Sequence, residues 1–226
     1  MELVCKTVVF FLLVSTSLGI DGELAQDFVA IAGPLPTTLA HRLHLQSHIL
    51  PKEALDPTVS EAHDDFCQQD TVISQLPQYF SHLREIGVTH YKVFLPWARI
   101  LPDGDAKKPD EAQVRCYQEL LKMLVAADLR PVIVLHHKGV PDTVAVGRKA
   151  SSFADLFVDY AEFSFYVFGG LADMWLTFSD LPELLESLPY SDSQVRVQAL
   201  AAAHERAYSV YHKKYSGKNR GKDFCI

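Results

Sequence analysis

The chain alternates between helical stripes of apolar residues and short runs that are apolar throughout. The first stripe begins at Asp70, repeats every three or four residues, and stops at Gly87. Each of the first three stripes is followed by a run typical of a buried strand, at residues 91–95, 132–135 and 175–178. The residues that define the four helices are Ile73, Leu76, Phe80, Leu83 and Ile86; then Val114, Tyr117, Leu121, Leu124 and Val125; then Phe153, Leu156, Phe157, Tyr160, Ser164 and Val167; and finally Val197, Leu200, Ala201, His204, Tyr208 and Tyr211.

The spacing of these elements predicts an α/β fold with a parallel sheet. Helices that alternate with short apolar strands indicate βα units whose sheet is covered on both faces. An earlier strand is predicted at residues 28–32, and residues 34–70, which are rich in Pro, Asp, Gln and His, are predicted to be mostly loop. A closed (β/α)8 barrel takes roughly 250 residues. The 226 residues here therefore favour a partial barrel of about four units.

The N-terminus has the pattern of a signal peptide. Lys6 precedes the apolar run 7–14, and Ser17-Leu18-Gly19 fits the small-x-small rule for cleavage after residue 19. The run is shorter than the roughly 20 residues of a membrane-spanning helix, which favours a cleaved signal over an anchor. We therefore expect a protein of the secretory pathway, secreted or extracellular, with no membrane anchor.

The cysteines, the net charge and the histidines indicate which disulfide and which ligands to expect. Cys67, Cys116 and Cys225 follow the predicted cleavage site, and an oxidising compartment allows a Cys67–Cys116 disulfide that would leave Cys225 unpaired. The net charge of -7 disfavours nucleic-acid binding. Three histidines share helical spacing, but no cysteine or carboxylate completes a ligand set, so we expect neither a metal nor a cofactor; they are His41, His44 and His48.

Four segments resemble motifs of glycoside hydrolase family 1, in family order and spacing, over roughly residues 64–215. Residues 91–104, YKVFLPWARILPDG, are similar to "YRFSISWSRILPxG", and residues 135–141, LHHKGVP, to "LHHWDLP". Residues 175–181, WLTFSDL, stand where the family has "WITFNEP", and residues 203–207, AHERA, resemble its "AHxxA" helix. The resemblance implies the first half of a (β/α)8 barrel from a retaining β-glycosidase, which hydrolyses O-glycosyl bonds of β-galactosides or β-glucosides such as lactose.

The same resemblance implies an eroded active site. Retaining hydrolysis needs two carboxyl groups about 5–5.5 Å apart. The family's acid/base glutamate aligns with Asp180, its neighbouring asparagine with Ser179, and no segment matches the "TENG" motif of the nucleophile. His137 keeps the sugar-binding histidine, whereas the arginine that supports the nucleophile aligns with Lys92. We therefore expect a catalytically degenerate chain, with His137 and Ser179 as relics of substrate binding.

Two alternatives stay open at this stage. One is a non-catalytic pro-segment that assists folding or transport of a larger lactase-like polypeptide, because the odd number of cysteines and the incomplete sheet suggest a partner. Within the family, the chain resembles the N-terminal repeat of multi-repeat, brush-border members. The other is a residual sugar-binding module that uses His137 with Trp97 and Trp175, although the apolar neighbours of both tryptophans favour packing. The expected organisation is a signal peptide over 1–19, a loop-rich segment over 20–69, the partial barrel over 70–215 and a polar basic tail over 216–226.

Overall fold

Five strands in the described part of the chain form one parallel sheet. The structure is a computed structural model that describes residues 31–32, 67, 70–85, 87–137, 139–141, 150–179, 181, 184–185, 188, 190–217 and 223–225. The strands are β1 (Ile31–Ala32), β2 (His90–Phe94), β3 (Arg130–His136), β4 (Met174–Phe178) and β5 (Asp223–Cys225). They pair in chain order, β1-β2-β3-β4-β5. The three central strands confirm the sequence prediction, and the predicted first strand is present as β1, with residues 28–30 outside the described part.

Four long helices alternate with the strands, as predicted. They are α3 (Asp70–Glu85), α5 (Glu111–Ala126), α7 (Ala150–Phe168) and α9 (Ser193–Lys214). Local chemistry fixes two of their N-termini: Asp110 accepts hydrogen bonds from the amides of Ala112 and Gln113, at 2.9 and 3.0 Å, and Asp192 caps α9 in the same way. A short helix, α4 (Trp97–Ile100), was not predicted, because a single helical turn has too few residues to display a period.

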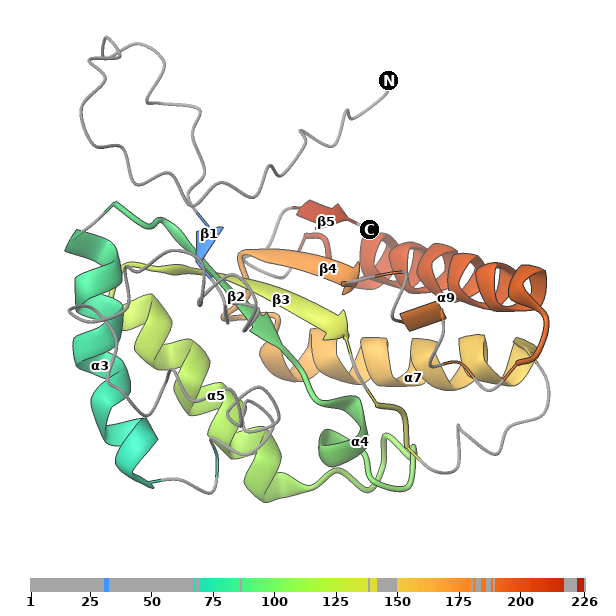
Figure 1. Ribbon diagram of the computed structural model, residues 1–226, viewed down its shortest axis with the longest axis horizontal. Helices are drawn as coiled ribbons and strands as arrows, with labels where there is room; N and C mark the ends of the chain where they lie inside the picture. Colours follow the sequence, from blue (N-terminus) through green and yellow to red (C-terminus); the bar gives the residue numbers. More distant parts are fainter. Residues whose placement is uncertain are drawn as a thin grey trace, which may run out of the picture.

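The long helices cover one face of the sheet (Figure 1). Tyr91 of β2 packs edge-on against Phe80 of α3, with ring centroids 5.3 Å apart. Trp175 of β4 meets Phe165 of α7 at 4.9 Å, and the neighbouring Thr177 bonds His204 of α9. These strand residues alternate with Lys92 and Phe94, which pair in register with Val132 and Val134 of β3 and share the opposite face. In a closed barrel that opposite face is the interior.

Aromatic residues fill the core between the sheet and the helices. Trp97 and Trp175 are both fully buried, which confirms that they serve packing. Trp97 stacks on Tyr160 with centroids 5.0 Å apart, and the Tyr160 hydroxyl donates to the carbonyl of Leu135. These contacts attach α4 and α7 to the end of β3, so the aromatic core positions the carboxyl ends of the strands.

The C-terminal segment differs from the expectation. The sequence predicted a polar tail without any barrel element, yet Asp223–Cys225 forms β5 and pairs in parallel with residues 174–176 of β4. A three-residue strand has no periodicity that a pattern search could detect, and it forms because β4 offers an open edge. The structure therefore contains the beginning of a fifth strand after the four βα units.

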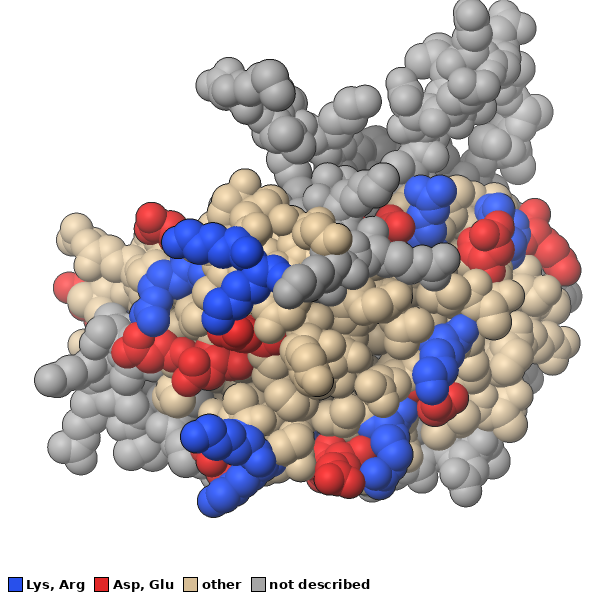
Figure 2. Space-filling model, turned by 180° about the vertical axis from the view of Figure 1, so that it is seen from behind, with Lys and Arg blue, Asp and Glu red and all other residues tan. Residues whose placement is uncertain are grey.

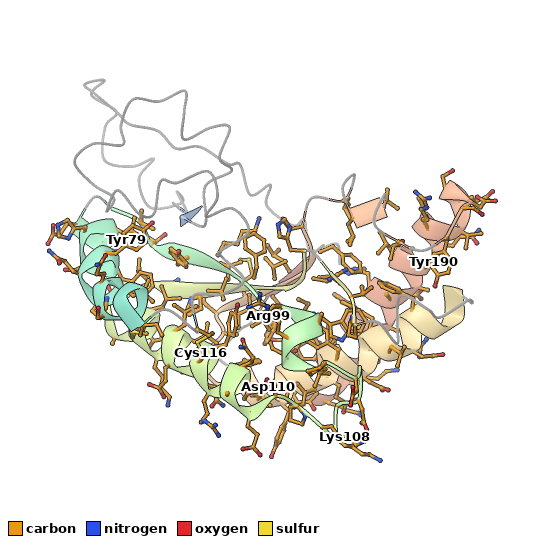
Figure 3. All side chains as sticks on the ribbon, turned by 60° about the horizontal axis from the view of Figure 1, so that its bottom comes forward. Tyr79, Arg99, Lys108, Asp110, Cys116 and Tyr190 are labelled. Atoms are coloured by element: carbon orange, nitrogen blue, oxygen red, sulfur yellow. A yellow bond between two sulfur atoms is a disulfide. The ribbon has the colours of Figure 1, made fainter. Side chains whose placement is uncertain are left out.

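A disulfide joins the start of the described helical region to α5. Cys67 and Cys116 are bonded, which is the pairing that the sequence left open. Figure 3 labels Cys116 on α5, in the helical layer below the sheet. A second tie between the same regions is the ion pair of Arg84, at the end of α3, with Asp128 in the turn after α5, at 2.6 Å.

Candidate functional site

The predicted site residues converge at the carboxyl ends of β2, β3 and β4. Lys92 lies within β2, His137 directly follows β3, and Ser179 directly follows β4. The backbone amide of Ser179 donates to the carbonyl of His136 at 3.2 Å, so the two strand ends are held together. Since this is the end of the strands where α/β barrels place their active sites, the sequence prediction and the fold select the same edge.

A buried hydrogen bond crosses the sheet at this edge. The ammonium Nζ of Lys92 donates to Oγ of Ser179 at 3.0 Å, and both side chains are more than nine-tenths buried. Because β3 lies between the two strands, the lysine reaches across its neighbour to make this bond. The same ammonium lies 4.9 Å from the ring centre of Phe94, which in turn contacts His137 at 4.5 Å between ring centroids. Lys92, Phe94, His137 and Ser179 thus form one contiguous group, which we call the edge cluster.

The two adjacent histidines occupy different environments. His137 is half-buried in the edge cluster, whereas His136 is buried among aromatic rings of α4, α7 and β4. Burial lowers the pKa of His136 to about 3, and the neighbouring His137 adds to the effect. Neither ring nitrogen of His136 has a hydrogen-bond partner in the described part of the chain. His136 is therefore a neutral core residue, whereas His137 belongs to the edge cluster at the strand ends.

The family-like motifs contact one another. Trp97 of the first motif lies 5.7 Å from His136 of the second, measured between ring centroids. Thr177 Oγ1 of the third motif and His204 Nδ1 of the fourth are 2.8 Å apart, and burial lowers the pKa of this histidine. Many of the family-like motif residues therefore serve packing around the strand ends. These packing residues are retained in this sequence, whereas residues aligned with catalytic positions differ from the family motif.

Sequence reasoning missed the direct bond between Lys92 and Ser179. It identified each residue separately, as a substitution of a family position, but the two are 87 positions apart in the chain. The available signal was that Lys92 lies in β2 and Ser179 directly follows β4, two parallel strands separated only by β3. A long lysine side chain can span the intervening strand, and that reach could not be read from spacing.

The candidate acid/base residue Asp180 lies outside the described residues, as do His41, His44 and His48. Among the residues that are described, no three His, Cys, Asp or Glu side chains are grouped so as to hold a metal ion. In the same residues, none of the helices combines the length and apolar character needed to cross a membrane. The described chemistry of the edge cluster consists of one ammonium, one hydroxyl, one imidazole and one aromatic ring.

A parallel sheet in chain order, with helices on its outer face and a polar cluster at the strand ends, defines the fold class as the (β/α)8 barrel, of which this chain has a part. The family model for "Glycosyl hydrolase family 1" matches residues 68–225, and the chain belongs to that family.

Curated relatives agree with this assignment. The chain is 42% identical to lactase/phlorizin hydrolase of Homo sapiens over 211 residues, which cover 92% of the chain and 11% of the relative. It is also 42% identical to Klotho of Homo sapiens over 101 residues, covering 43% of the chain and 10% of that protein. The chain therefore spans only about a tenth of the length of these relatives.

Solved structures show the same fold. Aphid myrosinase matches with a TM-score of 0.60 at 20% identity, covering 67% of this chain and 36% of the enzyme. A family 1 β-glucosidase from Thermotoga maritima matches with a TM-score of 0.58 at 22% identity, covering 68% of this chain and 37% of the enzyme. Since the chain covers little more than a third of either enzyme, the described sheet is a partial α/β barrel.

Proposed function

We propose that this chain is a family 1 glycosidase domain that has lost hydrolytic activity of its own. The observation that carries the proposal is the hydrogen bond between Lys92 and Ser179. Both positions align with polar family residues that face the reaction, one supporting the nucleophile and the other bonding the sugar 2-hydroxyl. Here they bond each other, and both are buried.

The carboxylates that the reaction requires support the same conclusion. Retaining hydrolysis needs a nucleophile and an acid/base, and the sequence has no counterpart of the nucleophile motif. Asp180 supplies a carboxyl at the acid/base position, but its side chain is one methylene shorter than glutamate. A displacement of about 1 Å in a catalytic group costs on the order of a hundredfold in rate. A lysine at position 92 also lacks the two-pronged geometry with which arginine holds a carboxylate.

The purified chain is expected not to hydrolyse aryl β-glucosides or aryl β-galactosides above the spontaneous rate. The measurement is release of the chromogenic aryl group, with the Thermotoga maritima β-glucosidase as a positive control for the assay. Turnover that disappears in Asp180→Ala would show that the site is active and would overturn the proposal. Turnover that persists in that variant points to a contaminating enzyme, and a repurified sample must then show none.

The expected compartment is the secretory pathway. The Cys67–Cys116 disulfide supports this proposal, because such bonds form and persist in oxidising compartments. The predicted signal peptide over 1–19 leads to the same compartment and lies outside the described residues. A β-glycoside or oligosaccharide is the proposed ligand class, with His137 and Ser179 as its relic contacts and Asp180 as the residue that aligns with the family's acid/base.

A second candidate function is that of a pro-segment for a longer lactase-like polypeptide. The open parallel sheet favours it. Among the described residues, β1 and β5 are the outer strands and each pairs on one side only, so further strands could pair with either. Co-expression with a catalytically complete family 1 repeat is expected to raise the secreted, folded yield of that repeat several-fold. An unrelated secreted domain of similar size is the control, and an equal yield with both would remove this candidate.

A further inference from the structure

The outward face of α7 carries an unusual combination of charge and exposed aromatic surface. Asp155, Asp159, Glu162 and Tyr166 follow one another at intervals of four, three and four residues, so they form one stripe along the helix. Tyr166 is 80% exposed, more than any other large hydrophobic side chain in the described part of the chain. Single exposed apolar residues are common on protein surfaces, so the surroundings of Tyr166 decide what it means.

A groove of about 580 Å³ opens beside this stripe. Its walls are the loop that follows α4, the outward face of α7, and Tyr215 just after α9. A second hollow of about 260 Å³ adjoins it and shares Phe163, continuing over Val114 and Val167. Together they form what we call the outer groove, lined by Asp103, Gly104, Asp105, Ala106, Lys107, Pro109, Glu111, Val114, Arg115, Leu156, Asp159, Glu162, Phe163, Tyr166, Val167 and Tyr215.

The charges along the outer groove are mostly negative. In its larger part, four carboxylates, those of Asp103, Asp105, Asp159 and Glu162, line the groove with a single lysine. On α7, the two ends of the acidic stripe are neutralised by α9: Asp155 pairs with Arg206 at 2.6 Å and Glu162 with Lys214 at 2.7 Å. Figure 2 shows that acidic and basic side chains lie next to one another on the back of the molecule. Asp159 lies between the two pairs, exposed, with no ion pair to any described residue.

The apolar floor lies directly against this negative charge. Phe163 and Leu156 are half-buried and pack on the core from the groove side, and Tyr215 donates to Glu162 at 3.4 Å. The loop wall, residues 103–107, leads directly to Lys108 and Asp110, which Figure 3 labels on the helical side of the sheet. None of the residues of the edge cluster lines the outer groove, so the two are separate sites.

We infer that the outer groove is a docking site for an extended segment of a partner protein that carries arginine or lysine side chains between apolar ones. An open hollow that continues over two helices suits an extended chain better than a small molecule, which is usually enclosed on most sides. A guanidinium group pairs with carboxylates and stacks on an exposed tyrosine ring. Asp159 and Tyr166 offer one contact of each kind, about two helical turns apart on α7. The alternating apolar side chains would contact Phe163 and Leu156.

The test uses the purified full chain and two synthetic ten-residue peptides, one alternating Arg with Leu and one alternating Glu with Leu. Calorimetric titration is expected to show saturable binding of the arginine peptide, weakened by added salt because the contacts are partly ionic, and no binding of the glutamate peptide. The double variant Asp159→Asn, Tyr166→Ala should bind the arginine peptide at least tenfold more weakly. Both side chains are exposed, and circular dichroism would verify that the variant folds.

Two matched substitutions outside the outer groove show whether a loss of peptide binding is specific to the groove. Tyr208→Ala removes another exposed tyrosine, on α9, and Asp128→Asn removes a carboxylate from the turn after α5, where asparagine tolerates the positive φ of 58°. Both control variants should bind like the unmodified chain. Absence of saturable binding, equal binding of the glutamate peptide, or equal loss in the controls would overturn the inference. Self-association in sedimentation experiments that is abolished by Tyr166→Ala would instead assign the groove to a second copy of the chain and also overturn it.

Discussion

Replacing both Cys67 and Cys116 with alanine is expected to lower the free energy of unfolding by about 4 kcal/mol. The bond joins residues 49 positions apart, and the loop it closes contains α3, β2 and α4. Without the bond, the unfolded chain gains the freedom to separate these ends, and that entropy favours unfolding. A loss of this size is a large part of the 5–15 kcal/mol that stabilises a typical domain.

Urea unfolding followed by tryptophan fluorescence measures this effect, because Trp97 and Trp175 are both buried in the fold. Dithiothreitol should destabilise the unmodified chain to a similar extent and leave the double alanine variant unchanged. If the variant and the unmodified chain unfold at the same urea concentration, the bond does not constrain the unfolded state as described. The reductant comparison also separates loss of the covalent link from loss of the half-buried sulfur atoms.

Replacing His136 with leucine is expected to make the fold less sensitive to acid. In the folded chain its pKa is about 3, well below the value of about 6.5 for a free histidine. Between these two pH values the unfolded state binds a proton at this position that the folded state does not bind. Stability therefore falls as the pH drops below about 6.5, by up to roughly 1.4 kcal/mol for each pH unit.

The expected difference is about 2–3 kcal/mol at pH 4.5. At that pH, relative to pH 7, the unmodified chain should lose this much more stability than His136→Leu. Burial also lowers the pKa of His90 and His204, so a shallower decline remains in the variant. His82→Leu, at an exposed position on α3, is the control and should follow the unmodified chain. Parallel pH profiles for His136→Leu and the unmodified chain would contradict the prediction.

The reason that His136 tolerates this burial lies in its surroundings. The rings of Trp97, Phe153, Phe157 and Phe178 surround it at centroid distances of 5.7 to 6.4 Å. None of these side chains carries a negative charge or an oxygen acceptor, so burial disfavours the charged form of the imidazole. The neutral histidine therefore packs like a flat apolar side chain at neutral pH. In acid its burial lowers the free energy of unfolding.

An element of this fold could be predicted from the sequence only where its apolar residues form a recognisable pattern. The helix that begins at Asp70 and the strands around residues 93, 133 and 176 were found because their apolar residues recur, or run together, over a long enough stretch. α4 and β5 were missed because each is only three or four residues long. Their positions depend on neighbours that are distant in sequence: the aromatic core for α4 and the open edge of β4 for β5.

The site was predictable as a set of residues but not as an arrangement. Family motifs identified His137, Ser179 and Lys92 individually, and the topology of parallel strands places them on one edge. The 3.0 Å hydrogen bond from Lys92 Nζ to Ser179 Oγ depends on the rotamer of the lysine and on the placement of β2 and β4 on either side of β3, which no local pattern encodes. The difference between His136 and His137 likewise comes from packing of the helices against one of them.

The strand order also governs how the chain can assemble as it is made. Each strand of the sheet pairs with the one that precedes it, so every new strand finds its partner already synthesised. Translation at roughly 5–20 residues per second delivers a βα unit of about 40 residues every 2 to 8 seconds. Since loop closure and helix formation take microseconds or less, each unit can settle on the growing sheet before the next one emerges. The sheet is therefore suited to stepwise assembly that starts from β1. At each step, the most recently added strand is the one with which the next strand pairs.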